Sequence, residues 1–203
     1  RSIIELAQSG RLDFLSAALF PSTCDVIRNL SGMWQVLHPS VYVRYLDLPQ
    51  VADPDTGGRF WERELETLLR ELGDVSGRPG SEETLREAIA TGNAARRLVR
   101  DLYHARCERP WSIPTEELFV LLRAAEVVTA EAFLERGRAY LAAAESEPGP
   151  MKDKSRVILV GAFCEQPPLG LIKTIERAGC YIVDDDLLLG ISFLTQDVPA
   201  DGV

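Results

Sequence analysis

Two cysteines occupy positions at which thiol chemistry is expected. Cys24 and Cys164 each follow an expected strand and stand close to the start of an expected helix. Open α/β sheets bind ligands at the carboxyl ends of their strands. The positive end of a helix stabilises a thiolate, the form of cysteine that attacks electrophiles and binds metals. We therefore expect the two thiols to converge at one cleft and to act together.

The sequence around Cys164 is the most informative stretch of the chain. The apolar, β-branched run Val157–Val160 predicts a parallel strand covered on both faces. Gly161 allows a sharp turn after it. Pro168 suits the beginning of a helix, and Gly179 is a suitable residue to end that helix.

Cys24 lies in a second unit of the same kind. Leu15–Phe20 is a plausible strand, and a helix is expected to open at Cys24 with Ser22 or Thr23 as its cap. Val41–Leu46 follows as another strand. This strand–helix–strand order predicts two parallel strands.

The remaining cysteines and a run of carboxylates are less specific. We expect Cys107, in a charged helical segment, and Cys180, at the start of a strand, to be small buried residues. Asp184–Asp186 follows that strand and is equally well explained as a solvated turn with a helix cap or as a wall of the cleft.

Thiolate ligation of an iron–sulfur cluster is the most economical use of Cys24 and Cys164. The chain contains no Cys-x-x-Cys pair, phosphate-binding Gly-x-x-x-x-Gly-Lys, Gly-x-Gly-x-x-Gly or Gly-x-Ser-x-Gly motif. Two cysteines are too few for a four-thiolate cluster. Further ligands would come from Cys180, from sequence outside this chain, or from solvent or substrate.

Composition excludes several classes of partner. No run of about 18 apolar residues is present, so we expect no membrane span. The net charge of −9 leaves no basic stripe for nucleic acid. Four cysteines without close pairing indicate a reducing compartment, and we expect a cytoplasmic location.

The chain is expected to fold as α/β units separated by helices. Residues 1–58 read as part of a first α/β lobe, 59–147 as a layer of four helices, and 148–203 as the start of a second α/β lobe. One strand–helix–strand unit hardly covers a parallel sheet. We therefore expect a fragment of a longer polypeptide or a chain that relies on a partner.

The chain resembles the 2-hydroxyacyl-CoA dehydratase and benzoyl-CoA reductase subunits. The segments that carry the resemblance are Pro21–Leu30, Tyr45–Pro49, Asn93–Arg97 and Arg156–Asp186. It implies two flavodoxin-like lobes, both incomplete in this chain, joined by helices. It also implies a 4Fe–4S cluster held by three cysteines beside the acyl-CoA, a related sister subunit, and an ATP-hydrolysing iron–sulfur activator that supplies electrons.

Site residues carry over by position. Cys24 matches the ligand of the family's Thr-Cys-Asp motif, whereas Leu188 stands where dehydratases have a later cysteine ligand. The sequence around Cys164 resembles the benzoyl-CoA reductase branch, and Cys164 is a candidate replacement ligand. Glu165 beside it is a candidate proton donor to the substrate. Arg28 is a candidate contact for CoA phosphates, or else a surface ion pair.

The resemblance thus implies a subunit of an ATP-dependent benzoyl-CoA reductase, with the B type favoured over the C type. Such a subunit would bind a cluster and an aromatic acyl-CoA for low-potential electron transfer to the ring. Two alternatives stay open: a subunit of a radical 2-hydroxyacyl-CoA dehydratase, and a non-catalytic partner subunit.

Overall fold

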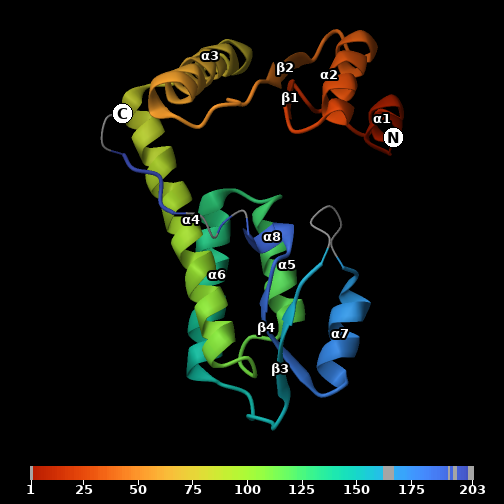
Figure 1. Ribbon diagram of the computed structural model, residues 1–203, viewed down its shortest axis with the longest axis vertical. Coiled ribbons are helices and arrows are strands. Elements are labelled where there is room, and N and C mark those ends of the chain that lie inside the picture. The colour runs from red at the N-terminus through yellow and green to blue at the C-terminus, as the bar shows by residue number, and fades with distance from the viewer. Residues whose placement is uncertain (1, 162–166, 192, 194–195, 201–203) are drawn as a thin grey trace. The chain divides into compact units, whose positions relative to one another are not determined.

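The structure is a computed structural model that describes residues 2–161, 167–191, 193 and 196–200. Contacts divide the chain into two compact units, residues Arg1–Ser81 and Glu82–Val203 (Figure 1). The four helices expected between the two α/β parts are all present. The first of them belongs to the first unit and the other three to the second.

The first unit is built around a pair of parallel strands. Its elements are α1 (Ser2–Gln8), β1 (Ala17–Pro21), α2 (Asp25–Leu37), β2 (Tyr42–Leu46), the short helical turn η1 (Pro54–Gly58) and α3 (Arg59–Ser76). Strands β1 and β2 pair in register from Ala17 opposite Tyr42 to Pro21 opposite Leu46. The buried residues Phe20 and Trp34 pack α2 against the strands, with ring centroids 5.8 Å apart.

Helix α3 is fixed to β2 by a small polar network. Arg44 donates to Glu71 at 2.7 Å and to Glu64 at 2.9 Å, and Tyr42 donates its hydroxyl proton to Glu71. The hydrogen bond from Tyr42, together with the nearby Arg44 charge, holds the pKa of Glu71 below its ordinary value. The network therefore favours an ionised Glu71 in the folded state.

The second unit is a helical bundle with a small parallel sheet. Its elements are α4 (Glu82–Glu108), α5 (Thr115–Ala125), α6 (Ala130–Ser146), β3 (Ser155–Leu159), α7 (Leu169–Arg177), β4 (Cys180–Asp185) and α8 (Leu188–Ile191). Figure 1 shows the β3–β4 sheet between the α4–α6 helices and α7. The core lies mainly among the three long helices and includes Val99, Leu102, Leu118, Leu122 and Phe133.

A buried ion pair joins β4 to α4. Arg106 and Asp185 contact each other at 2.7 Å, and their side chains are 1% and 2% exposed. Tyr103 donates to the same carboxylate at 3.0 Å, and the Arg106 guanidinium stacks 4.5 Å from the Tyr103 ring. Burial raises the pKa of Tyr103, so its hydroxyl keeps its proton as a donor.

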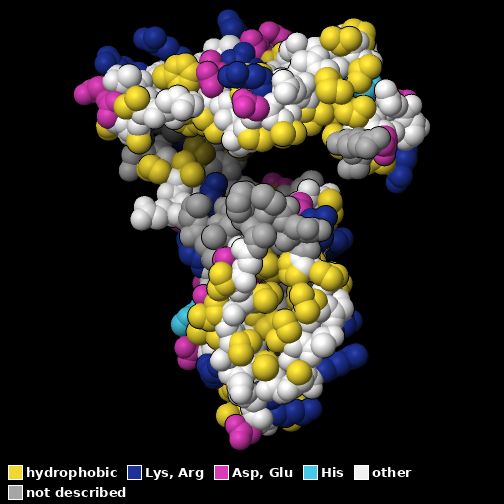
Figure 2. Space-filling view, turned by 45° about the vertical axis from the view of Figure 1, so that its right-hand side comes forward, with side chains coloured by type: hydrophobic (Ala, Val, Ile, Leu, Met, Phe, Trp, Pro, Cys, Tyr) yellow, Lys and Arg dark blue, Asp and Glu magenta, His cyan; other side chains and the backbone are white. Residues whose placement is uncertain are grey.

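Some details differ from the sequence expectations. The expected helix from Pro168 to Gly179 is confirmed, with Pro168 as N-cap and Gly179 just past the helix at φ 99°. The expectation that the Val157–Val160 strand is covered on both faces is wrong for the described residues: Ile158 is 63% and Val160 73% exposed. Figure 2 shows hydrophobic side chains gathered on one face of this unit. Each sheet has two strands among the described residues, so the flavodoxin-like topology stays a prediction.

We expect Arg106→Met to lower the free energy of unfolding by about 3–5 kcal/mol, because Asp185 would stay buried without its partner. Arg109→Met is the matched control, since Arg109 and Glu145 form an exposed pair at 3.3 Å and such pairs contribute about 0–1 kcal/mol. Urea unfolding of both variants measures the difference. Equal effects would show that burial of the Arg106–Asp185 pair carries no special stability.

The lowered pKa of Glu71 predicts that the stability of the fold depends on pH. Because its folded-state pKa lies below the ordinary 4.5, its stabilising contribution is complete above that value and is lost as the pH falls through the folded-state pKa. We expect the stability of the wild type to fall more steeply below pH 4.5 than that of Glu71→Gln. Unfolding curves recorded on either side of this pH test it, and parallel curves would contradict it.

Candidate functional site

Cys24 directly precedes α2, and its sulfur does not cap the helix. It is the N-cap residue, has extended backbone angles (φ −164°, ψ 167°), is exposed, and makes no side-chain capping bond. Its carbonyl accepts from the amides of Ile27 and Arg28 at 3.1 and 3.2 Å. The expectation that Ser22 or Thr23 caps this helix is therefore wrong. The thiol stands at the positive end of a helix and is available to a ligand.

Ser22 has a different task, which is to hold the Cys24 turn against the end of β2. Its amide donates to the Leu46 carbonyl at 2.9 Å, and its hydroxyl accepts from the Leu48 amide at 2.8 Å. Both contacts lie at the carboxyl ends of β1 and β2. They fix the turn before Cys24 relative to the loop after β2.

Arg28 places a cation one helical turn after Cys24. A hydrogen bond with Tyr45 and the charges of Asp25 and Asp47 raise the pKa of Arg28, whose guanidinium is fully exposed. Arg28 thus lies close to the carboxyl end of β2. A guanidinium at this position suits an anion such as phosphate.

A groove of about 270 Å³ lies beside this end of β2. Most of its lining is apolar or backbone and comes from Leu48, Pro49, Val51, Thr56, Gly57 and Phe60. We call it the carboxyl-edge groove. Asp53 holds the loop that forms part of it by accepting from the amides of Asp55 and Thr56 at 3.0 and 2.9 Å.

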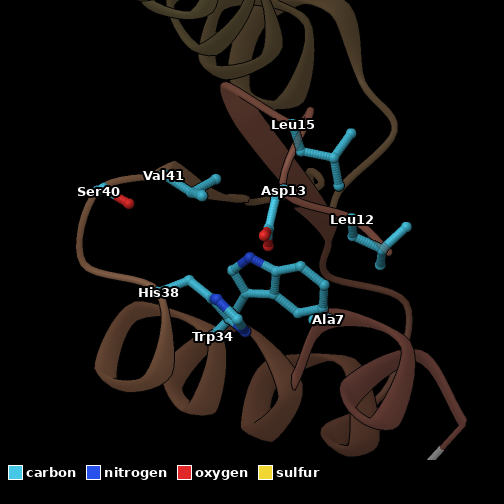
Figure 3. A pocket seen from close by; sticks show the side chains of 8 residues that line it. All are labelled: Ala7, Leu12, Asp13, Leu15, Trp34, His38, Ser40 and Val41. Atoms are coloured by element: carbon cyan, nitrogen blue, oxygen red, sulfur yellow. The ribbon is translucent and has the colours of Figure 1, made fainter. Parts of the chain in front are cut away.

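A second pocket lies at the opposite, amino ends of the same strands. Figure 3 shows Trp34, His38 and Asp13 converging in it, with the Asp13 carboxylate pointing toward the indole. Trp34 Nε1 and His38 Nε2 are buried and have no hydrogen-bond partner among the described residues. Leu15 and Val41 line this pocket, so it lies at the edge of the sheet opposite to Cys24, whereas open α/β sheets bind their ligands at the carboxyl ends.

In the second unit, the three aspartates at the end of β4, two within the strand and one directly after it, have different tasks. Asp185 is held by Arg106 and also accepts from the Leu187 amide at 3.1 Å. Asp186 accepts from the Gly161 amide at 3.0 Å, and its own amide donates to Leu159 at 3.2 Å. The Asp184 side chain is 56% exposed. Asp186 therefore fixes the point at which the chain leaves β3.

Of the other expected site residues, the structure describes some and not others. Cys164 and Glu165 lie outside the described residues, so their convergence with Cys24 stays a prediction. Cys180 pairs with Ser155 at the amino end of the β3–β4 sheet, about 16 Å along the strand from its other end. Cys107, expected to be buried, is exposed, whereas Cys180 is half-buried.

The described residues contain no group of three His, Cys, Asp or Glu side chains that could hold a metal ion. Within the same residues, no helix is both long and apolar enough to cross a membrane. A cluster bound through Cys24 and held by three or more such side chains would thus draw at least one further ligand from beyond the described part of the chain.

The chain belongs to the family described as 2-hydroxyglutaryl-CoA dehydratase, D-component, whose match covers residues 1–203. It is 46% identical over 202 residues to the C-type subunit of benzoyl-CoA reductase from Thauera aromatica, a match that covers 100% of this chain and 52% of that protein. The comparison thus supports the family expected from the sequence but points to the C type rather than the B type.

More distant relatives are dehydratase subunits. The beta subunit of lactoyl-CoA dehydratase of Anaerotignum propionicum is 25% identical, over 92% of this chain and 49% of the relative. The beta subunit of (R)-2-hydroxyglutaryl-CoA dehydratase of Acidaminococcus fermentans is 24% identical, over 98% of this chain and 52% of the relative. The chain spans about half the length of these curated relatives.

Sequence reasoning missed two features of this edge. The hydrogen bond from the Leu48 amide to the Ser22 hydroxyl joins segments 26 positions apart. No sequence pattern in either segment predicts it. The carboxyl-edge groove was missed as well, although Tyr45–Pro49 was among the segments that carried the resemblance. Its far wall comes from the first turn of α3, which the apolar periodicity assigned to the helical layer alone.

We expect Ser22→Ala to lower the free energy of unfolding by about 1 kcal/mol, because the Leu48 amide loses its acceptor. Hydrogen exchange at the Leu48 amide should become faster. Ser9→Ala is the control: Ser9 donates to the Leu6 carbonyl on an exposed helix end, and its loss should change stability by less than about 0.5 kcal/mol. Unchanged exchange at Leu48 would contradict the assigned bond.

Proposed function

We propose that this chain is a subunit of an ATP-dependent benzoyl-CoA reductase, which binds an iron–sulfur cluster and an aromatic acyl-CoA for low-potential electron transfer to the ring. The observation that carries the proposal is the 46% identity to a C-type benzoyl-CoA reductase subunit along the whole chain. The dehydratase subunits reach only 24–25%, which supports the reductase branch. A cytoplasmic location and the absence of nucleic-acid partners belong to the same proposal.

The described residues are compatible with part of a cluster site. Iron–sulfur clusters are held by cysteine thiolates, and Cys24 is an exposed, free cysteine whose sulfur does not cap its helix. Cys164 is the second proposed ligand, with the remaining ligands contributed from outside the described residues. When bound, a 4Fe–4S cluster would supply electrons at low potential to the substrate.

The protein groups around Cys24 have their own tasks. Ser22 fixes the turn, so that the sulfur is presented at a constant position relative to β2. Arg28 provides a permanent cation for the anionic CoA moiety. Glu165 is proposed to hold a proton for transfer to the reduced substrate.

Partners follow from the same proposal. The relatives are themselves named as subunits, of the C type in the reductase and as beta subunits in the dehydratases, which supports assembly of this chain with a related sister subunit. An ATP-hydrolysing iron–sulfur activator would deliver the electrons. A non-catalytic role in such a complex is the competing outcome of the experiment that follows.

We expect Cys24→Ala and Cys164→Ala, each introduced into the full complex and purified without oxygen, to lose most of the iron and acid-labile sulfide that this subunit binds. Cys107→Ala is the matched control, because Cys107 is also exposed but has no proposed ligand role. Colorimetric iron and sulfide analysis gives the result. Unchanged cluster content in both variants would remove the ligand assignment.

Substrate turnover separates the reductase from the dehydratase. With activator and ATP supplied, the wild-type complex is expected to consume benzoyl-CoA and to leave 2-hydroxyacyl-CoA unchanged. The reverse preference would assign the chain to the dehydratase branch. A full cluster complement on the sister subunit alone would make this chain the non-catalytic partner.

A further inference from the structure

We propose that the carboxyl-edge groove binds the acyl group of the CoA thioester and that it selects a neutral, apolar ring. The inference rests on the proposed function, because it assumes an acyl-CoA substrate. It adds the residues that would recognise the acyl part, namely Leu48, Pro49, Val51 and Phe60. None of these residues was a candidate in the sequence.

The first argument is location. Pro21 at the end of β1 lies opposite Leu46 at the end of β2, and Ser22 bonds to both Leu46 and Leu48. Leu48 lines the groove, while Cys24 follows Ser22 by two positions. The groove and the proposed ligand are therefore parts of one strand edge, the edge at which α/β sheets bind ligands.

The second argument is the chemistry of the walls. Val51 is 52% and Phe60 39% exposed, so apolar surface that usually avoids water faces the groove. Asp47 is the one ionisable group in its lining among the described residues. An acyl group that carries a carboxylate would lose hydration against these apolar walls, whereas an uncharged ring would not.

The third argument is size. An apolar cavity of roughly 150 Å³ is known to hold benzene. The groove has a volume of about 270 Å³, enough for a six-membered ring with part of its thioester linkage. An acetyl group would leave most of the apolar wall uncovered.

The fourth argument is rigidity. Gly57 is buried, and a Cβ placed on it would lie 1.7 Å from the Val51 carbonyl oxygen and 3.3 Å from Pro49. Only glycine allows the loop after β2 to pack directly on η1. The backbone of the loop that carries Pro49 and Val51 is thus held directly against η1.

The test uses the full complex with its sister subunit and measures dissociation constants for benzoyl-CoA and for free CoA by titration calorimetry. We expect Val51→Asp to weaken benzoyl-CoA binding about tenfold or more, since it places a second carboxylate in the groove. Phe60→Ala should weaken it about threefold to tenfold through lost apolar contact. Both should leave the affinity for free CoA within about twofold, a factor worth less than about half a kcal/mol.

Val127→Asp is the matched control. Val127 is 81% exposed just beyond α5 and is not part of the lining of the carboxyl-edge groove, so both affinities should stay unchanged. Size-exclusion chromatography and circular dichroism accompany each variant. Separation of the complex in Val51→Asp would show that the groove is covered by the sister chain and would overturn the proposal.

The two proposals fail differently. If Val51→Asp and Phe60→Ala bind benzoyl-CoA like the wild type and keep their iron, the groove assignment is wrong and the proposed function stands. If the wild type holds no iron but Val51→Asp selectively loses benzoyl-CoA affinity, the groove assignment survives and the cluster assignment fails. A wild-type complex that does not bind benzoyl-CoA overturns both.

Discussion

The parallel pairing of β1 with β2 is the constraint on which the candidate site depends. Parallel strands end at the same edge of a sheet, so Pro21 and Leu46 come to lie opposite each other although far apart in the sequence. The candidate site residues of the first unit lie at that edge. The Cys24 turn leaves one strand, the groove loop leaves the other, and Ser22 ties the two together.

In the second unit, the end of a strand is held in place by charged side chains. Asp185 ends β4 and is held by Arg106 and Tyr103 of α4, in surroundings that exclude water. A buried ion pair contributes little net stability compared with apolar packing, but breaking it is costly. It therefore acts mainly to keep the end of β4 in one place. Asp186, next along the chain, holds Gly161 and hence the exit from β3.

Much of the fold could be predicted because it depends on local patterns. Apolar periodicity identified the four long helices, and the glycine after α7 has the positive φ that such a helix end requires. The cap of α2 could not be predicted, because Ser22 is bound by a backbone amide from a distant loop instead. The burial of β3 was overestimated. An apolar run shows that a strand favours burial, but it does not show which element covers the strand. Ile158 is exposed because none of the described elements packs on it.

The candidate site was predicted unevenly. The position of Cys24 followed from the order of strand, turn and helix, which is local. The proposed ring-binding groove depends on Phe60 of α3 meeting the loop after β2, which is a tertiary contact without a signature in either segment. Arg28 was recognised as a cation near the cysteine, but its proximity to Tyr45 and Asp47 is a product of helix packing.

Selective alkylation of Cys24 tests the central claim most directly. The complex, purified without oxygen, would be treated with iodoacetamide before and after its iron is removed with a chelator, and each cysteine followed by peptide mass spectrometry. Cys24 should be protected at first and modified after iron removal, whereas the exposed Cys107 should be modified in both samples. Equal modification of Cys24 before and after would show that its sulfur binds no cluster.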